Sequence, residues 1–438
     1  MRSLRVAVAG GGLGGLALAR GLLRTGADVT VYERDASLVT RRQGYRLHLD
    51  ARAGLALDAL LPPESFALFQ ATCAQPSRRL TVTTERLRVL HEQVADNRGA
   101  GPYAPATLST SVDRQTFREV LAAGLDGRIA FGHELARHEA GADSVRLYFA
   151  DGQEAEADVL VGADGVGSAV RRQYLPAASP ADGGARCIYG KTSLDPDAAL
   201  PAVLEDGFTA VVGGRIGMAI GVVRFRTPPQ ALGLTPARDY VMWALAGDRQ
   251  CFGVPGTELT ALDPAGLHAL SARLIRTWHP DLRALHAAAD VDQTFAIRVR
   301  TSPAVPAWPP SRVTVLGDAI HAMSPARGSG ANIALQDAAL LCRLLTMDGV
   351  LIRDGMLTTD GIPTTDGIPT TDGSDVVAAI GDYERQMREY GYAAVAASRQ
   401  AEAQTGARRN RLLFWLYRRL ARDAPPTRNG SGGAADAV

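Results

Sequence analysis

The residues best suited to chemistry lie between 313 and 345, where a carboxylate follows a short apolar run. The β-branched residues at 313–316 predict a buried strand, and glycines and prolines mark the loop after it. A helix is expected to begin near Asn332, because apolar residues recur at helical spacing beyond it. A carboxylate beside the positive end of a helix suits a cofactor that becomes anionic at one edge, as a reduced flavin does. The candidates here are Gly317, Asp318, Pro325, Gly328, Gly330, Ala331 and Asn332.

A second glycine-rich turn, GGGLGG, follows an expected strand at 4–9 and precedes an expected helix from about Leu13 to Arg24. In dinucleotide-binding folds such glycines allow a tight turn, the close approach of a pyrophosphate and the contact between helix and strand. The next strand ends at Glu33, which would bind the adenosine ribose hydroxyls and repel a 2′-phosphate, and Arg34 follows it. The residues assigned to the turn are Gly10, Gly12, Leu13, Gly14 and Gly15.

Three other segments supply charged candidates. The basic stretch 41–50 contains Arg42 and Arg46, either of which could contact phosphates or the flavin edge. Arg114 falls in the first turn of a predicted helix, where a cation is unfavourable, so we expect an anionic partner for it. Asp164 follows a predicted buried strand and is a second carboxylate at the edge where open α/β sheets bind ligands.

The composition disfavours several classes of protein. The chain has 438 residues and a formal net charge of +1, so no overall field favours nucleic acid or an acidic partner. Its four cysteines are far apart and lack metal-type spacing, which fits a reducing cytoplasm better than a disulfide scaffold. No apolar run of about eighteen residues and no signal-type segment occurs, so we expect a cytoplasmic protein without a membrane span.

The order of the predicted elements indicates the fold class. Strands followed by glycine turns and helices, at both ends of the chain, favour a Rossmann-like nucleotide-binding unit. Between 187 and 297 several strand-like runs predict an antiparallel sheet with one or two helices, suited to form a substrate pocket. The expected class is α/β, or α+β overall: a Rossmann-like domain, an antiparallel-sheet substrate domain and C-terminal helices.

The predicted boundaries follow these changes of pattern. The nucleotide-binding domain comprises 1–75, 105–186 and 298–350, and the substrate-binding domain comprises 76–104 and 187–297. The hexad repeat DGMLTT, DGIPTT, DGIPTT within 351–375 cannot build a core and predicts a disordered surface loop. Helices are expected over 376–422, the last one docked across two domains or laid on a membrane surface, before a disordered tail over 423–438. Single elements expected are a helix at 51–61, an exposed strand at 80–90, strands at 208–212, 216–224 and 240–245, and a helix at 265–277.

Taken together, three segments resemble the single-component, or class A, flavoprotein monooxygenases, which include p-hydroxybenzoate hydroxylase and the tetracycline-modifying monooxygenases. The matching segments are GGGLGG with Glu33, VGADGVGSAVRR, and GDAIHAMSPARGSGANIALQDA. The residues between the second and third segments match only in size and strand character. The resemblance implies a p-hydroxybenzoate hydroxylase-like fold.

The resemblance also implies a role for each candidate. Glu33 and the glycines at 10, 12 and 15 would hold the ADP half of FAD, and Asp318 would bind the ribityl chain. Arg114 would contact the flavin side, with Arg42 or Arg46 nearby. The loop ending at Gly328, Gly330, Ala331 and Asn332 would run beside the isoalloxazine, and Asp164 would support both FAD and a passing nicotinamide cofactor. The catalytic candidates are Pro325, which faces the substrate side, His321 and Arg46. For His321, which lies near the flavin by sequence context, a structural hydrogen-bonding role is favoured over a catalytic one.

The implied reaction uses FAD, NAD(P)H and O2 as co-substrate. The chain shows no second dinucleotide fingerprint, which fits the resemblance, because in this family NAD(P)H binds transiently in a groove without a Rossmann domain of its own. The reaction would hydroxylate an aromatic or polycyclic small molecule through a flavin C4a-hydroperoxide, as a step in natural-product tailoring. The protein's share would be positioning and the exclusion of water, which explains why the sequence shows no catalytic triad. A small-molecule substrate, no nucleic acid and a monomer or homodimer are expected.

Other activities would use the same FAD motifs. A Baeyer–Villiger or epoxidising oxygenase needs no different motif, and a FAD-linked reductase or dehydrogenase would transfer no oxygen. A flavin-dependent halogenase is disfavoured because the chain has no W-x-W-x-I-P segment. The non-enzyme alternative is a FAD-binding protein that sequesters a ligand, and the intact Asp318 with its Pro-x-x-Gly-x-Gly loop argues against it.

Overall fold

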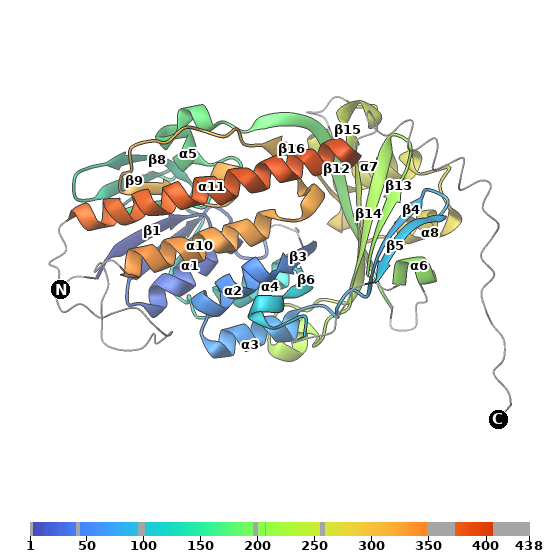
Figure 1. The fold of residues 1–438 in the computed structure, drawn as a ribbon, viewed down its shortest axis with the longest axis horizontal. Coiled ribbons are helices and arrows are strands. Elements are labelled where there is room, and N and C mark those ends of the chain that lie inside the picture. Colours follow the sequence, from blue (N-terminus) through green and yellow to red (C-terminus); the bar gives the residue numbers. More distant parts are fainter. Residues whose placement is uncertain are drawn as a thin grey trace.

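In the computed structural model, one parallel sheet carries both glycine-rich turns (Figure 1). The structure describes residues 3–40, 44–94, 101–195, 200–205, 207–254, 259–347 and 373–405. The sheet has the order β17-β11-β1-β2-β7, with every pairing parallel. Because parallel strands end at the same edge, the candidates that follow these strands are brought together there. The strands are β1 (Arg5–Ala9), β2 (Asp28–Glu33), β7 (Ile129–Phe131), β11 (Val159–Gly162) and β17 (Val313–Val315).

Three helices meet through small residues beside this sheet. They are α1 (Leu13–Arg24), α2 (Ala51–Leu60) and α10 (Gly330–Met347). A Cβ atom added to Gly21 of α1 would lie 2.3 Å from the Leu60 side chain and 2.9 Å from Cys342 Sγ. One added to Gly14 would lie 2.7 Å from the Leu316 side chain and 3.1 Å from the carbonyl oxygen of Ala334. Glycine therefore sets the close approach of α1 to α2 and α10, and Gly14 serves helix packing.

A seven-stranded sheet forms the other half of the molecule (Figure 1). Its order is β16-β12-β15-β14-β13-β4-β5, and all pairings are antiparallel except that of β13 with β4. The antiparallel sheet expected from the sequence is therefore confirmed, with one parallel pairing that β4, from a distant part of the chain, adds to it. The strands are β4 (Arg79–Thr84), β5 (Val89–Val94), β12 (Ala181–Ser193), β13 (Gly207–Val212), β14 (Ile216–Val223), β15 (Tyr240–Asp248) and β16 (Phe295–Thr301).

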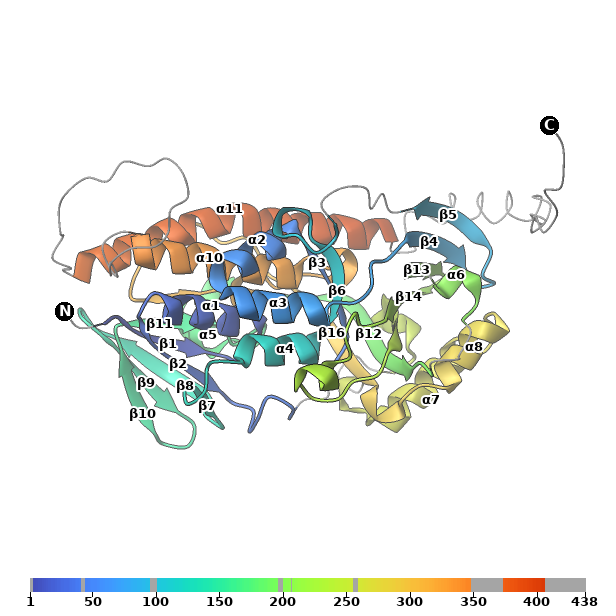
Figure 2. The same cartoon turned by 90° about the horizontal axis from the view of Figure 1, so that it is seen from below.

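Alternation along β15 gives this sheet two different faces. Trp243 and Leu245 pack in one apolar cluster with Leu267 of α7 (Pro264–Leu274) and Leu282 of α8 (Pro280–Ala287). Met242 and its neighbours of the same parity join a second cluster that includes Tyr45 from the nucleotide-binding half. Period-two alternation thus turns one face towards α7 and α8 and the other towards the five-stranded sheet and its helices (Figure 2).

Smaller elements connect the two large sheets. Strands β3 (Arg46–Asp50) and β6 (Ser109–Asp113) form an antiparallel pair, and β6 leads directly into α4 (Arg114–Ala122). The remaining small elements are α3 (Pro63–Thr72), the antiparallel sheet of β8 (Leu135–Ala140), β9 (Val145–Phe149) and β10 (Glu154–Ala157), α5 (Ala169–Tyr174) and α6 (Ala202–Glu205).

The last described helix, α11 (Gly373–Thr405), runs along α10 (Figures 1 and 2). It reaches the end of β17, where the Tyr383 hydroxyl donates to the carbonyl oxygen of Val315 at 3.0 Å. The short helix α9 (Asp318–His321) lies between these elements. In the described part of the chain, no helix is both long and apolar enough to span a bilayer. The hexad repeat, the last predicted helix at 407–422 and the tail lie outside the described residues.

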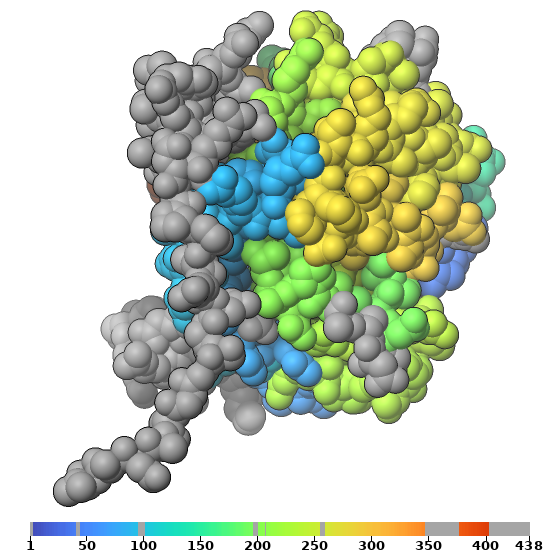
Figure 3. Space-filling view, turned by 90° about the vertical axis from the view of Figure 1, so that its right-hand side faces the viewer, coloured from blue at the N-terminus to red at the C-terminus, as the bar shows by residue number. Residues whose placement is uncertain are grey.

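The expected strand at 80–90 was wrong in its length. Leu87 has a φ of 57°, and its N–H donates to the carbonyl oxygen of Thr84, so a tight turn divides the segment into β4 and β5. Glu85 in that turn accepts a hydrogen bond from the His279 N–H at 2.9 Å. Figure 3 shows the result, with β4 and β5 in blue beside the yellow segment of α7 and α8. The domain boundaries drawn from the sequence stay a prediction.

Gly190 in β12 tests how tightly the seven-stranded sheet is packed on the face that is turned towards α7 and α8. A Cβ atom there would lie 2.0 Å from the Trp243 ring. Gly190→Ala should therefore lower the free energy of unfolding by about 1–3 kcal/mol, measured by denaturant titration. Gly214→Ala is the matched control, because nothing lies within 4 Å of its Cβ position. Equal effects of the two substitutions would contradict the packing described.

Candidate active site

The first glycine turn leaves no room for side chains at two positions. Gly10 has a φ of 111°, and an added Cβ would lie 2.4 Å from the carbonyl oxygen of Ala163. A Cβ on Gly15 would lie 2.2 Å from the carbonyl oxygen of Gly10. Gly12 differs, because it is the N-cap of α1 and its nearest neighbour would be 4.0 Å away. The N-terminus of α1, which begins at Leu13, is therefore approachable by a phosphate.

Glu33 at the end of β2 is buried and paired with an arginine that the sequence did not single out. Its Oε2 accepts hydrogen bonds from Gly11 N at 2.9 Å and Arg118 Nη2 at 3.0 Å, and its Oε1 accepts from Asp35 N at 2.9 Å. Arg118 Nε also donates to the carbonyl oxygen of Gly11 at 2.7 Å. This pair ties the glycine turn to β2 and α4. The one hint in the sequence is that Arg118 lies a helical turn after Arg114.

Asp318 presents a carboxylate at the same edge of the sheet. It begins α9 directly after Gly317, whose φ of 60° favours glycine. Among the described residues, no hydrogen bond to this solvent-reached carboxylate is found. Desolvation by the surrounding protein raises the pKa of Asp318, and the charges of His321 and Arg114 oppose this shift. Asp318 is therefore an acceptor with a cation nearby and with its oxygens available to a ligand.

Arg114 has no ion-pair partner within 4 Å in the described part of the chain. The Arg114 guanidinium lies 5.8 Å from the centroid of the Tyr45 ring. The backbone N–H of Arg114 donates to the carbonyl oxygen of Tyr45 at 3.0 Å. The anionic partner expected from the sequence is thus not provided by the described residues. Arg114 is a cation at a helix start, near enough to Asp318 to favour the charged form of that carboxyl, and it is available to a phosphate or to another ligand anion.

Asn332 organises the loop at the start of α10 instead of facing a ligand. Its Nδ2 donates to the carbonyl oxygens of His48 at 3.0 Å and Gly328 at 3.1 Å, and its Oδ1 accepts from Asp50 N at 2.8 Å. Asn332 is buried and its side chain holds the loop, and the expectation that this loop runs beside the isoalloxazine stays a prediction. Gly328 has a φ of 62°, and Gly330 and Ala331 start α10 and remain partly exposed. Pro325 is exposed on the loop.

His321 lies behind this loop and is fully buried. Its Nε2 is 2.6 Å from Asp337 Oδ2, which also accepts from Gly317 N at 2.8 Å, and Tyr390 donates to Asp337 Oδ1 at 2.5 Å. The imidazole has no exposed surface, so this geometry agrees with the structural hydrogen-bonding role expected for His321 and gives no support to a catalytic one. Gly391 of α11 also packs on the ring, since an added Cβ would lie 2.9 Å from its Cδ2. His321 positions Gly317 through Asp337.

Asp164 stands beside the first glycine turn, at the end of β11. Its Oδ2 accepts from Ala169 N at 2.6 Å and Val170 N at 3.4 Å, at the start of α5. Burial raises the pKa of Asp164, and these hydrogen bonds oppose the shift. Its Oδ1 is buried with no partner among the described residues. One oxygen therefore holds the turn, and the other is an acceptor for a donor brought by a ligand.

Arg46 reaches from β3 to the seven-stranded sheet. Its stem packs against Gly221 of β14, where an added Cβ would lie 2.6 Å from Arg46 Cδ, and its guanidinium lies 5.3 Å from the Phe208 ring centroid. Burial lowers the pKa of Arg46 to about 10. Its Nε is buried and has no partner in the described ranges. Arg34 is exposed at the end of β2, and Arg42 lies outside the described residues.

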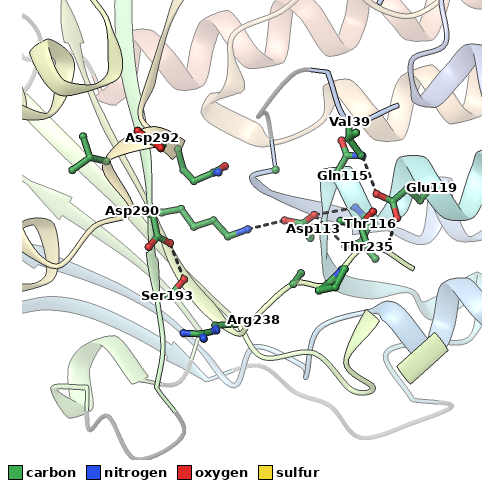
Figure 4. A pocket seen from close by; sticks show the side chains of 16 residues that line it. Val39, Asp113, Gln115, Thr116, Glu119, Ser193, Thr235, Arg238, Asp290 and Asp292 are labelled. Carbon is green, nitrogen blue, oxygen red and sulfur yellow. Dashed lines mark hydrogen bonds and ion pairs between the residues drawn. The ribbon is translucent and has the colours of Figure 1, made fainter. Parts of the chain in front are cut away.

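A pocket of about 620 Å³ opens between the two halves of the molecule (Figure 4). The start of α4 forms one wall, and β12 with residues 290–293 forms the opposite wall. Most of the residues that line it carry polar or charged side chains, unlike the aromatic cluster of Tyr45, Tyr189 and Phe295. Polar side chains that line it include Asp113, Gln115, Glu119, Lys191, Ser193 and Asp290.

Comparison with known proteins agrees with this geometry. A family model described as an FAD binding domain matches residues 3–185 and 269–348. A solved structure of a protein assigned as an FAD-containing monooxygenase from Photorhabdus luminescens superposes with a TM-score of 0.72 and 30% identity. That superposition covers 91% of this chain and 98% of the other.

Curated relatives extend the comparison to full-length enzymes. The dual O-methyltransferase/FAD-dependent monooxygenase elcB of Phaeosphaeria nodorum is 37% identical over 375 residues, which is 77% of this chain. The chain spans only 40% of the length of that relative. The 6-hydroxynicotinate 3-monooxygenase of Bordetella bronchiseptica is 28% identical over 351 residues, covering 79% of this chain and 84% of the relative.

The buried Arg118 pair supports a prediction about stability. Arg118→Met would leave the Glu33 carboxylate buried without its cation, so the free energy of unfolding should fall by about 3–5 kcal/mol. Arg137→Met is the matched control, because its ion pair with Glu139 is about half exposed on both sides, so solvent screens it and its loss should have little effect. Denaturant titration of both variants measures the difference. A small effect for Arg118→Met would show that the pair does not hold the glycine turn.

The His321–Asp337 pair predicts a pH dependence. Burial lowers the pKa of His321, but the charge and hydrogen bond of Asp337, with Asp318, outweigh burial and raise it above 6.5. A raised pKa means that protonated His321 contributes fully below pH 6.5 and loses this contribution as the pH rises through the raised value. The difference in free energy of unfolding between wild type and His321→Gln should therefore be largest at acidic pH.

The control for this pH series is Tyr390→Phe, which removes a neutral donor to the same carboxylate. It should cost about 1 kcal/mol with little dependence on pH. Urea titrations of the three proteins across the pH range measure both effects. A gap between wild type and His321→Gln that widens towards alkaline pH would contradict the assignment.

Proposed function

Because the chain belongs to the FAD-binding, class A monooxygenase family, we propose that it uses FAD, NAD(P)H and O2 to hydroxylate an aromatic or polycyclic small molecule. The observation that carries the proposal is the meeting of Asp318, Arg114 and the open turn at Gly12 on one edge of the parallel sheet. These groups come from three separate segments, yet they form one continuous set of ligand-facing donors and acceptors.

The residues present fit FAD. The N-terminus of α1 is open at Gly12 for the pyrophosphate, and Glu33 ends the neighbouring strand where the ribose would lie. Asp318, which no described residue hydrogen-bonds through its carboxylate, would offer that carboxylate to ribityl hydroxyls, and Asp164 would offer its buried Oδ1. The N-terminus of α10, at Gly330 and Ala331, would face the flavin edge that gains negative charge on reduction.

The protein's own contribution is to orient and to exclude water. When bound, FAD would supply the redox chemistry, taking electrons from NAD(P)H and passing them to dioxygen. Asn332 fixes the loop that carries Pro325, and Asp337 fixes the amide of Gly317 before Asp318. Arg114 would balance the negative charge of the cofactor.

The substrate would lie against the inner face of the seven-stranded sheet. Tyr189 and Phe295 stack with ring centroids 5.3 Å apart, and Tyr45 lies 5.5 Å from Tyr189, which gives an aromatic surface for a flat ring. Arg46 adds a cation that, in the described residues, has no carboxylate within ion-pair distance. We assign Arg46 to an anionic or electron-rich oxygen of the substrate.

The polar pocket between the two halves suits the electron donor better than the substrate. Its lining of amides, hydroxyls and charges matches the many hydrogen-bonding groups of a nicotinamide nucleotide. It adjoins the start of α4, next to Arg114 and thus to the proposed flavin site. Binding in this pocket would allow the protein to use NAD(P)H without a second dinucleotide-binding glycine turn.

The biological setting belongs to the same proposal. Two of the relatives, elcB among them, are named as dual enzymes that join an O-methyltransferase to an FAD-dependent monooxygenase, and this pairing favours a tailoring step in natural-product synthesis. We place the enzyme in the cytoplasm, as a monomer or homodimer, because few large apolar side chains are exposed in the described part of the chain.

Oxygen-isotope labelling tests the reaction. Protein loaded with FAD is mixed with NADH or NADPH under ¹⁸O2 and with a panel of hydroxylated naphthalenes and anthraquinones. We expect a product that carries one labelled oxygen atom, with one nicotinamide nucleotide oxidised per product. Turnover of a panel compound without label would favour the FAD-linked reductase. Failure of both nucleotides to reduce the flavin would contradict the proposal.

Asp318 gives a prediction that needs no substrate. Asp318→Ala removes a charged acceptor for the ribityl chain, so the Kd for FAD should rise about 10- to 100-fold. Fluorescence titration of the FAD-free protein measures it. Asp382→Ala is the matched control, because Asp382 is an exposed carboxylate on α11 that pairs with Arg385. An unchanged Kd in Asp318→Ala would remove this residue from the cofactor site.

A further inference from the structure

Asp113 does more than cap the helix that follows it. Its Oδ1 accepts from Thr116 N at 3.0 Å, which is the N-cap bond of α4. Its Oδ2 faces away from the helix and accepts from the Tyr240 hydroxyl at 3.0 Å and Lys191 Nζ at 3.4 Å. An N-cap needs one oxygen, so the second oxygen is committed to the seven-stranded sheet.

Lys191 and Tyr240 form a matched pair on that sheet. They lie on the neighbouring strands β12 and β15, and Lys191 Nζ is 3.8 Å from the centroid of the Tyr240 ring. The Asp113 and Lys191 side chains are 3% and 16% exposed, and Tyr240 is fully buried. Lys191 supplies the cation that a buried carboxylate requires, and it is the only lysine in the chain.

We propose that Lys191 is a positioning residue. Its charge holds the seven-stranded sheet against the start of α4 and so fixes Arg114 beside the pocket that we assign to the nicotinamide nucleotide. Arg114 is the residue after Asp113, so a shift of Asp113 moves the guanidinium directly. A second contact lies further along α4, where Thr235 N donates to Glu119 Oε2 at 2.9 Å. This contact does not involve Lys191 and would remain if the Lys191 ion pair were lost. The proposal rests on the proposed function in one respect, that flavin reduction by a nicotinamide nucleotide depends on this alignment.

The kinetic test compares FAD-loaded wild type, Lys191→Met and Lys191→Arg. Anaerobic stopped-flow mixing with NADH or NADPH gives a limiting rate of flavin reduction and an apparent Kd. Lys191→Met should lower the limiting rate about tenfold or more, because a small misplacement of reacting groups is costly. Lys191→Arg should restore most of the rate. Tyr240→Phe, which removes one neutral donor and keeps the ion pair, should lower it less than threefold.

Several controls separate positioning from other roles. Arg128→Met removes a half-exposed ion pair with Asp28 and should leave the rate unchanged. If Lys191→Met lost thermal stability but kept its limiting rate, or changed only the apparent Kd, the proposal would be overturned. A rate in Lys191→Arg as low as that in Lys191→Met would also overturn it, because the charge would then not be the property that matters.

Chemical modification gives the same test without a substitution. Acetylation removes the charge of Lys191, and reductive dimethylation keeps it. Both reagents also modify the α-amino group, so Lys191→Arg treated in the same way is the control for that reaction. Acetylated wild type should resemble Lys191→Met, and dimethylated wild type should resemble the untreated protein. Equal rates after both treatments would overturn the proposal.

Hydrogen exchange distinguishes failure of this proposal from failure of the proposed function. In Lys191→Met, amides at 114–119 should exchange about tenfold faster than in wild type, while those of β1 should not change. If neither nucleotide reduces wild-type flavin, the proposed function fails, and this exchange result alone decides whether Lys191 holds α4. Unchanged exchange at 114–119 would overturn the positioning role.

Discussion

A buried carboxylate that accepts hydrogen bonds from three elements holds the ligand-facing end of β17. Asp337 takes one from the amide of Gly317, one from His321 and one from Tyr390 on α11. Gly317 has a left-handed backbone that would relax if its amide lost this acceptor. Because Asp318 follows it directly, the position of the one carboxylate that faces the proposed ribityl chain depends on Asp337. A helix more than fifty residues later in the chain thus supports the cofactor loop from behind.

The other charged residues also fall into two groups, those that fix the backbone and those that remain available to a ligand. Glu33 and Asp113 are buried and fully engaged, the first with Arg118 and the second with Lys191. Asp318, by contrast, lacks a hydrogen-bond partner in the described part of the chain. Buried pairs therefore fix the backbone, and exposed charges at the same edge remain available to ligands. This arrangement explains why a flavin enzyme of this kind needs no acid–base triad, since the cofactor supplies the reactivity and the protein supplies its position.

The sequence alone was a good guide to local structure. Glycine spacing predicted the turn between β1 and α1, and alternation predicted strands close to β13, β14 and β15. These features depend on residues near one another in the chain, where propensity and period act directly. The class of fold and the family resemblance were confirmed by the comparisons.

Partners far apart in the chain were not predictable in this way. Nothing near Arg118 indicates that it will pair with Glu33, and nothing near Tyr390 indicates Asp337, because these contacts arise only when the sheet and helices assemble. For the same reason the sequence could indicate a structural hydrogen-bonding role for His321 but not its partner Asp337 or the covering helix α11. The parallel pairing of β4 with β13 likewise depends on a connection of more than a hundred residues.

A crystal structure of the protein grown with FAD would test the central claim most directly. We expect the pyrophosphate at the N-terminus of α1, the ribityl chain within hydrogen-bond distance of Asp318, and the flavin ring between Arg114 and the loop from Pro325 to Asn332. Well-ordered FAD elsewhere, or no density for FAD at saturating concentration, would contradict the account.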